Sequence, residues 1–130
     1  MYETELAIVG AGPAGLSAAI EARKAGVEVL LIDENSRPGG QLFKQIHKFF
    51  GSRDHKAGIR GMNIASTLLE ESEELGIETW LKGEVCGIEE GRNLWVVRDR
   101  KCSELVKAKK IILATGATEN AVAFKGWELP

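Results

Sequence analysis

The feature that most constrains this chain is the segment AIVGAGPAGLSAA, which holds three glycines in the pattern G-x-G-x-x-G. Gly10, Gly12 and Gly15 stand directly after an apolar run and directly before residues that favour a helix. The first glycine lets a strand turn sharply, because it adopts backbone angles that other residues avoid. The second lets an anion approach the backbone, and the third lets the helix pack closely on the strand. The spacing predicts a dinucleotide-binding turn, provided that a strand precedes it and a helix follows.

The neighbouring residues provide that context. Glu5–Val9 is a short, nearly continuous apolar run, typical of a strand covered on both faces. Ala14–Ala25 is rich in alanine and predicts a helix, which Gly26 ends. Val27–Asp33 predicts a second buried strand. Strand, helix and strand together match one right-handed βαβ unit of about 30 residues.

An acid at the end of the second strand narrows the choice of ligand. Asp33 lies 23 positions after Gly10, near the spacing of about 20 at which a carboxylate binds an adenosine ribose. Because an acid repels a 2′-phosphate, the pattern favours FAD or NAD over NADP. The pyrophosphate is expected near Pro13–Gly15, where free amides and the helix dipole favour negative charge. This unit alone does not separate FAD from NAD.

The remaining residues predict an α/β fold. A long connection follows Asp33 and is a candidate functional segment, since ordinary connections have about 4–6 residues. The elements predicted after it are a helix over Met62–Leu75, strands over Ile77–Leu81, Glu84–Glu89 and Leu94–Arg98, and a last strand from about Ser103 through IILATG. We expect a parallel sheet whose strands, in order, contain Ile77, Val27, Glu5 and Ile111, covered by two helices and an antiparallel meander.

Composition excludes some classes of partner. A net charge of −2 gives no electrostatic reason to expect nucleic acid or an anionic membrane. No apolar run approaches the roughly 20 residues that cross a bilayer, and the start MYETELAIVG lacks a signal-peptide pattern, so we expect a cytoplasmic protein.

The cysteines and histidines match no metal-ligand spacing, which favours free thiols and no metal; they are Cys86, Cys102, His47 and His55. His47 is a candidate proton donor, although such a histidine is more often a surface residue.

Two further stretches carry a family resemblance. RPGGQL follows the second predicted strand and IILATGA ends the last one, and both place small residues where a backbone can lie against a flat ligand. Together with the glycine turn, in this order, they resemble the FAD-binding part of the pyridine-nucleotide-disulfide oxidoreductase superfamily. DENSRPGGQL and the closing ATGATENAVAFKGWELP look like the branch with the alpha subunit of heterotetrameric sarcosine oxidase and related amine or amino-acid dehydrogenase subunits.

The resemblance implies a Rossmann-like FAD-binding domain in a flavin-dependent oxidoreductase. Electrons would pass between NAD(P)H, or an amine or amino acid, and an acceptor through FAD. Other subunits of a hetero-oligomeric dehydrogenase are candidate partners. The C-x-x-x-x-C pair of the dihydrolipoamide dehydrogenase type does not follow the double glycine, where the sequence reads QLFKQIHKF.

Relatives continue beyond Leu129–Pro130 into a second domain, so we expect residues 1–130 to be the N-terminal FAD-binding portion of a longer flavoprotein. Any NAD(P) site and the residues that select the electron donor are then expected outside this chain. Three alternatives stay open: an NAD-binding module of a dehydrogenase, a non-catalytic subunit that holds FAD, and a flavin-dependent RNA-modifying protein. The acidic balance disfavours the last.

The resemblance also implies which residues contact the cofactor, and it identifies no catalytic residue. The implied contacts are Gly10, Gly12, Pro13, Ala14 and Gly15 with the pyrophosphate, Asp33 and Glu34 with the adenosine ribose, Val85 with the adenine, Gly40, Gln41 and Leu42 with the ribityl and flavin half, and Ala114, Thr115 and Gly116 closing over the cofactor.

Overall fold

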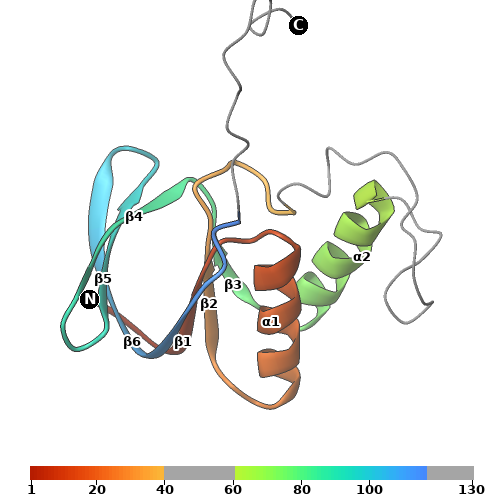
Figure 1. Cartoon of the computed structure of the whole chain (residues 1–130), viewed down its shortest axis with the longest axis horizontal. Helices are drawn as coiled ribbons and strands as arrows, with labels where there is room; N and C mark the ends of the chain where they lie inside the picture. Colours follow the sequence, from red (N-terminus) through yellow and green to blue (C-terminus); the bar gives the residue numbers. More distant parts are fainter. Residues whose placement is uncertain (40–60, 117–130) are drawn as a thin grey trace, which may run out of the picture.

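The computed structural model describes residues 1–39 and 61–116, which form one six-stranded sheet and two helices (Figure 1). The elements are β1 (Tyr2–Val9), α1 (Pro13–Lys24), β2 (Val29–Ile32), α2 (Gly61–Glu74), β3 (Glu78–Trp80), β4 (Gly83–Glu89), β5 (Asn93–Arg98) and β6 (Cys102–Leu113). The strand order is β3-β2-β1-β6-β5-β4. The predicted α/β class is confirmed.

Four strands form the parallel part of the sheet in the predicted order. β1 lies between β2 and β6, and Ala7 pairs with Leu30 on one side and with Ile111 on the other. β3 pairs in parallel with the far edge of β2. All four residues of β2 are buried, as expected for a strand covered on both faces. The chain from β1 through α1 to β2 is the predicted βαβ unit.

β1 begins earlier than the apolar run suggested. The structure extends the strand back to Tyr2, whereas the sequence predicted a start at Glu5. Exposed Glu3 and Glu5 flank buried Thr4 in this first half, so only one face is covered there. A search for continuous apolar residues misses such an alternating segment.

The meander continues the parallel sheet rather than forming a separate cover. β4, β5 and β6 are antiparallel neighbours, and β6 also pairs in parallel with β1. β6 has 12 residues, about twice the usual strand length, so it has enough residues to pair with both neighbours. This strand therefore joins the two halves of the sheet.

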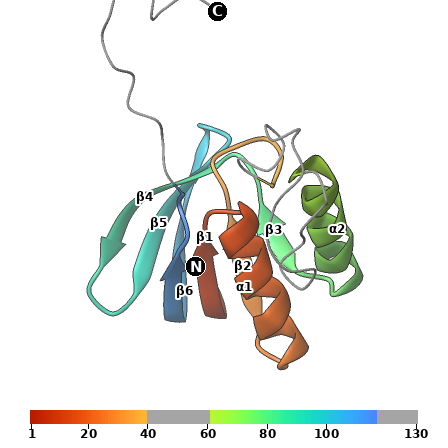
Figure 2. The same ribbon diagram turned by 45° about the vertical axis from the view of Figure 1, so that its right-hand side comes forward.

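The two helices cover one face of the sheet. α1 and α2 lie side by side, as the two ribbon views show (Figures 1 and 2). Leu16 and Ala19 of α1 pack against Leu6 and Ile8 of β1, with further contacts from α2. This cluster fixes α1 over the carboxyl end of β1, where the glycine turn lies.

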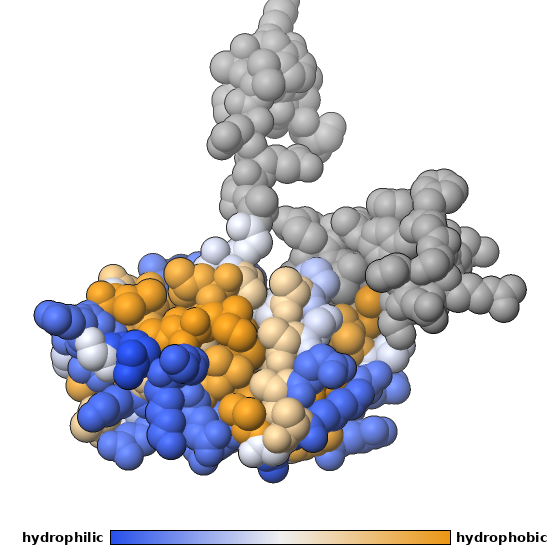
Figure 3. Space-filling view, turned by 60° about the horizontal axis from the view of Figure 1, so that its bottom comes forward, coloured by the Kyte–Doolittle hydropathy of each residue, from blue (hydrophilic) through white to orange (hydrophobic). Residues whose placement is uncertain are grey.

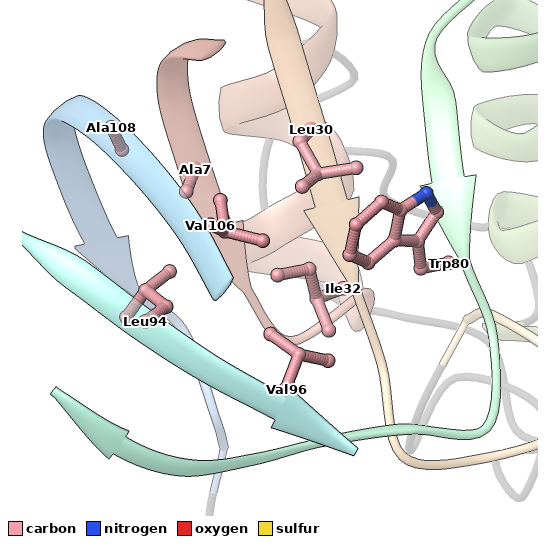
Figure 4. Close-up of a cluster of buried hydrophobic side chains, with 8 residues drawn as sticks. All are labelled: Ala7, Leu30, Ile32, Trp80, Leu94, Val96, Val106 and Ala108. Atoms are coloured by element: carbon pink, nitrogen blue, oxygen red, sulfur yellow. The ribbon is translucent and has the colours of Figure 1, made fainter. Parts of the chain in front are cut away.

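A second cluster fills the opposite face, where the sheet curls so that the meander approaches β2 and β3 (Figure 4). Its members are Ala7, Leu30, Ile32, Trp80, Leu94, Val96, Val106 and Ala108. Trp80 is only 2% exposed. The Tyr2 ring meets it edge-on with centroids 4.9 Å apart, and the Arg98 guanidinium carbon lies 4.3 Å from the ring centroid. These contacts tie β5 to the parallel strands.

Part of the surface is apolar. A space-filling view shows apolar residues gathered beside charged ones on one side of the molecule (Figure 3). Within the described ranges, the large apolar side chains that stay exposed are Met1, Ile88, Trp95, Ile112 and Leu113. Neither α1 nor α2, the helices of those ranges, is long and apolar enough to cross a membrane.

Candidate functional site

A cleft of about 250 Å³ lies at the carboxyl ends of β1 and β2, the edge where open α/β sheets bind ligands. Its lining residues are Val9, Gly10, Ile32, Asp33, Glu34, Asn35, Gly83, Glu84, Val85 and Thr115. Gly10, Asp33, Glu34, Val85 and Thr115 were predicted from sequence, and they come from four separate segments. The volume is below the roughly 300–1,000 Å³ of pockets that enclose a whole ligand, so the cleft suits one end of a dinucleotide.

Gly10 is required by the fold itself. Its φ is +109°, in a region that side chains disfavour. A Cβ on Gly10 would overlap the carbonyl oxygen of Ala114 and lie 2.6 Å from its carbonyl carbon. The Ala114 N–H donates to the Val9 carbonyl at 2.8 Å, which holds the end of β6 across the turn. Gly10 therefore lets the chain at the end of β6 pass close to the glycine turn, which brings Thr115 to the cleft.

Gly15 is also required by packing, whereas Gly12 is not required by its backbone. A Cβ on Gly15 would overlap the carbonyl oxygen of Gly10 and lie 2.9 Å from its carbonyl carbon, so α1 rests directly on the turn. Gly12 has φ −77° and ψ −168°, an extended conformation that any residue adopts. The backbone angles of Gly12 therefore do not by themselves account for glycine at this position.

The start of α1 is suited to an anion. Gly12 occupies the N-cap and Pro13 begins the helix, one residue before the predicted start at Ala14. No side chain caps the first amides, and no acidic residue stands in the first turn. Gly12 is partly exposed, and Pro13 and Ala14 are exposed. Amides at such a helix start, with the helix dipole, favour a negatively charged group.

Asp33 is a buried carboxylate with protein partners on both oxygens. It is 7% exposed. Oδ2 accepts a hydrogen bond from the Ala11 N–H at 2.7 Å. Oδ1 accepts from the Asn35 N–H at 2.8 Å and from Asn35 Nδ2 at 2.9 Å. Glu34, the next residue, is exposed and lines the same cleft.

Backbone hydrogen bonds hold the segments around the cleft together. The Gly39 N–H donates to the Ala11 carbonyl at 2.7 Å, which ties the RPGG stretch to the glycine turn. The Gly83 N–H donates to the Asp33 carbonyl at 2.8 Å, which ties the start of β4 to the end of β2. A Cβ on Gly83 would lie only 3.0 Å from Ile32 Cγ2, so a small residue suits this approach.

The other predicted residues lie around these segments. Val85 precedes a register shift between β4 and β5 that resembles a β-bulge. Ala114 packs against the cluster under α1, and Gly116 has φ +76°. Gly40, Gln41 and Leu42, like His47 and His55, lie outside the described residues.

Sequence reasoning did not name five of the cleft residues, which are Val9, Ile32, Asn35, Gly83 and Glu84. Asn35 had a usable signal, because an Asp that accepts a hydrogen bond from the N–H two residues later is a known turn pattern. Gly83 and Glu84 gave no such signal, since their place in the cleft depends on how β4 returns to β2.

The described residues show neither a metal-ligand cluster nor a disulfide. Residues 1–39 and 61–116 contain no group of three or more histidine, cysteine, aspartate or glutamate side chains that could hold a metal ion. Cys86 and Cys102 are free and exposed. The glycine turn, the helix start and the acid at the end of β2 match the pattern from which a dinucleotide site was predicted.

Comparison with known proteins identifies the family. The sequence profile of the pyridine nucleotide-disulphide oxidoreductases matches residues 4–129. The chain belongs to this family. Membership implies an oxidoreductase with FAD as its cofactor, in agreement with the resemblance found in the sequence.

Curated members of this family resemble the chain over nearly its whole length. An opine oxidase subunit from Agrobacterium tumefaciens is 32% identical over 97% of this chain and 26% of its own length. The HcnB subunit of hydrogen cyanide synthase from Pseudomonas aeruginosa is 34% identical over 95% and 26%. The alpha subunit of sarcosine oxidase from Rhizobium meliloti is 35% identical over 97% and 14%. The chain thus spans about a quarter or less of these three relatives.

Solved structures of such proteins share the fold. The L-proline dehydrogenase from P. horikoshii superposes with a TM-score of 0.79 and 28% identity, over 92% of this chain and 24% of that one. The thioredoxin reductase from Streptococcus pyogenes gives a TM-score of 0.71 and 31% identity, over 92% and 37%. These matches bear out the predicted Rossmann-like FAD-binding fold.

Proposed function

We propose that this chain is the FAD-binding portion of an oxidoreductase and that its cleft holds the adenosine end of the cofactor. The observation that carries this proposal is the juxtaposition of the uncapped start of α1 with a cleft lined by Asp33 and Glu34. An uncapped helix start suits a pyrophosphate, and carboxylates suit ribose hydroxyls. The residues present therefore fit FAD.

In this proposal, each predicted residue serves binding. Gly12, Pro13 and Ala14 receive the pyrophosphate, with N–H groups from Gly12 and Ala14 because proline has none. Gly10 and Gly15 let the turn adopt the shape that exposes this helix start. The acids at Asp33 and Glu34 serve the adenosine ribose, and Val85 meets the adenine through its backbone. The stretch from Ala114 to Gly116 closes over the cofactor.

The flavin supplies the redox chemistry when FAD is bound, and the protein supplies binding and orientation. Gly40, Gln41 and Leu42, which come directly after Gly39 in the sequence, are proposed to contact the ribityl and flavin half. None of the residues proposed for the cofactor acts as an acid or base here. Their proposed role is to bind and orient the dinucleotide at the carboxyl ends of β1 and β2.

We propose the chemical class of the electron donor from the names of the relatives. Sarcosine oxidase, opine oxidase and proline dehydrogenase are named for amine or amino-acid substrates. We propose a donor of this class, or NAD(P)H, bound by residues that this chain does not contain. The opine oxidase, hydrogen cyanide synthase and sarcosine oxidase relatives are named as subunits, which supports the proposal that the protein works with other subunits.

Binding titrations test the proposal. The intact protein, freed of bound cofactor, is titrated separately with FAD, FMN and NAD. FAD should bind most tightly, because FMN lacks the adenosine and pyrophosphate that the cleft and helix start are proposed to hold. Ser17→Ala changes an exposed residue one turn further along α1 and should leave FAD binding unchanged. Tighter binding of NAD than of FAD would contradict the proposal.

A further inference from the structure

The sheet has two edge strands, and they are protected unequally. β3, at one edge, has three residues, and β4, at the other edge, has seven. In the described parts of the chain, β4 pairs with β5 on one side and with no strand on the other, and Figure 2 shows it outermost. Natural edge strands avoid pairing with other chains by being short or by carrying lysine or proline. β4 is not short, and its sequence GEVCGIE contains neither residue.

The apolar layer inside the meander reaches this edge at Ile88. Ile88 pairs directly with the fully buried Leu94, and side chains directly opposite each other lie on one face. Val85, three positions earlier, packs on the same cluster, because the register shift between Val85 and Gly87 inserts one extra residue. Ile88 nevertheless stays 49% exposed. A further strand alongside β4 would bury the rest of this side chain.

The same edge is acidic. The segment 83–91 holds three glutamates and no basic residue; the glutamates are Glu84, Glu89 and Glu90. Across the strands, Glu84 pairs with Val97 and Glu89 pairs with Asn93, so neither glutamate faces a cation on β5. Within residues 1–39 and 61–116, no ion pair engages any of the three. The edge therefore suits a strand that brings positive charge.

We propose that β4 is a docking edge for a strand of a partner protein in which basic residues alternate with apolar ones. The backbone groups on the open side of β4 bind the backbone of that strand, which is the known mode of strand addition. An apolar side chain of the partner covers Ile88, and its basic side chains lie near the glutamates. This inference rests on the proposed association with other subunits, and it names the surface and the chemistry of that association.

A second copy of this chain fits the edge less well. Antiparallel pairing of two β4 strands about a two-fold axis between Cys86 and Gly87 sets Glu84 of one copy opposite Glu89 of the other. Like charges directly opposite each other destabilise a pair of strands. A basic strand meets the same glutamates with the opposite charge.

Peptide binding to the intact protein tests the inference. The probe is a capped peptide as long as β4, in which lysine and valine alternate. One control peptide has glutamate in place of lysine. The other keeps every side chain of the probe but carries methyl groups on its backbone nitrogens, so that it donates no hydrogen bond. Calorimetry should show that the probe binds at least about tenfold more tightly than either control, because each control loses one of the two proposed interactions.

Hydrogen exchange shows where the probe binds. The lysine–valine peptide should slow exchange of the amides of β4 that point away from β5. The amides of β3, at the opposite edge of the sheet, should exchange at their original rates and serve as the internal control.

Two isoleucines provide a matched pair of variants. Ile88→Thr keeps a β-branched side chain suited to a strand and removes apolar surface, so it should weaken probe binding about fivefold. Ile112→Thr makes the same change at a 38% exposed position on β6, away from the docking edge. It should leave the Kd for the probe unchanged.

The charge of the edge is tested by Glu89→Gln. Glutamine keeps an oxygen that can accept the hydrogen bond from Trp95 Nε1. The preference for the lysine–valine peptide over the glutamate–valine peptide should narrow by about twofold, the effect of one exposed ion pair. Glu3→Gln, an exposed acid on β1, should leave that preference unchanged.

Three results would overturn the inference: a probe that binds no better than its methylated form, exchange protection that falls outside β4, and unchanged probe binding by Ile88→Thr. Protection of β4 that rises with protein concentration in the absence of peptide would make a second copy the occupant, and would overturn the inference too. An FAD titration of the same preparation keeps the failures apart. Loss of FAD binding contradicts the proposed function, whereas absence of peptide binding by protein that binds FAD contradicts the docking edge.

Discussion

Replacing Gly12 by serine separates ligand binding from folding. Gly12 is the N-cap of α1 and has an extended backbone that serine adopts without strain. Serine is also a better N-cap than glycine, by a few tenths of a kcal/mol. Gly12→Ser should therefore leave the free energy of unfolding unchanged or slightly raised.

The same substitution should weaken FAD binding strongly. The new Cβ occupies the approach to the backbone, and the serine Oγ accepts a hydrogen bond from an early amide of α1 that the pyrophosphate would otherwise use. Losing one or two amide contacts with charged oxygens costs about 3 kcal/mol, which raises the Kd for FAD about a hundredfold.

Two measurements on one preparation check this prediction. Urea unfolding followed by circular dichroism gives the stability, and quenching of flavin fluorescence gives the Kd for FAD. The expected pattern is a stable protein that does not retain FAD. Tight FAD binding by Gly12→Ser, or a collapsed fold, would refute the assignment of this glycine to the ligand. Gly12→Val should lose FAD in the same way.

Three further predictions concern the fold and its stability. Gly15→Ala should destabilise the protein by at least about 1–3 kcal/mol in urea unfolding, because its Cβ meets backbone that cannot move aside. Arg98→Lys should cost about 0.5–1 kcal/mol by removing the guanidinium from above the Trp80 ring, and an unchanged urea midpoint would show that this contact does not stabilise the fold. Burial, aided by nearby carboxylates, raises the pKa of Tyr2. The contribution of Tyr2 to the free energy of unfolding should therefore be complete below about pH 10 and should be lost as the pH rises from there through the raised pKa. Tyr2→Phe should abolish that alkaline loss in unfolding measurements.

Most of the fold could be predicted because its signals are local. Apolar runs, terminating glycines and the helix stripe placed both helices within about a residue of their observed ends. They also gave the order of the parallel strands. The polar first half of β1 was missed because only one of its faces is covered. The continuity of the meander with the sheet was missed because it depends on the unusual length of β6, which pairs on both sides.

The residues that meet at the site could largely be predicted from the sequence, whereas the contacts that each of them makes could not. The spacing of Gly10 and Asp33 identified the turn and the acid, and the structure brings them to one cleft. No spacing rule reveals that the Asp33 carboxylate is occupied by Ala11 and Asn35, since this depends on the exact approach of the loop to the turn. The glycine spacing also does not reveal that Gly10 lies against the end of β6. Nor does it reveal that Gly12 has backbone angles that any residue adopts.

The most direct test of the central claim is the absorption spectrum of the intact protein as purified, followed by identification of whatever heat releases from it. The claim that this cleft and helix start hold FAD predicts flavin absorption bands and FAD, rather than FMN, in the released fraction. A protein that shows no flavin bands, takes up no added FAD and releases a nicotinamide dinucleotide would contradict it.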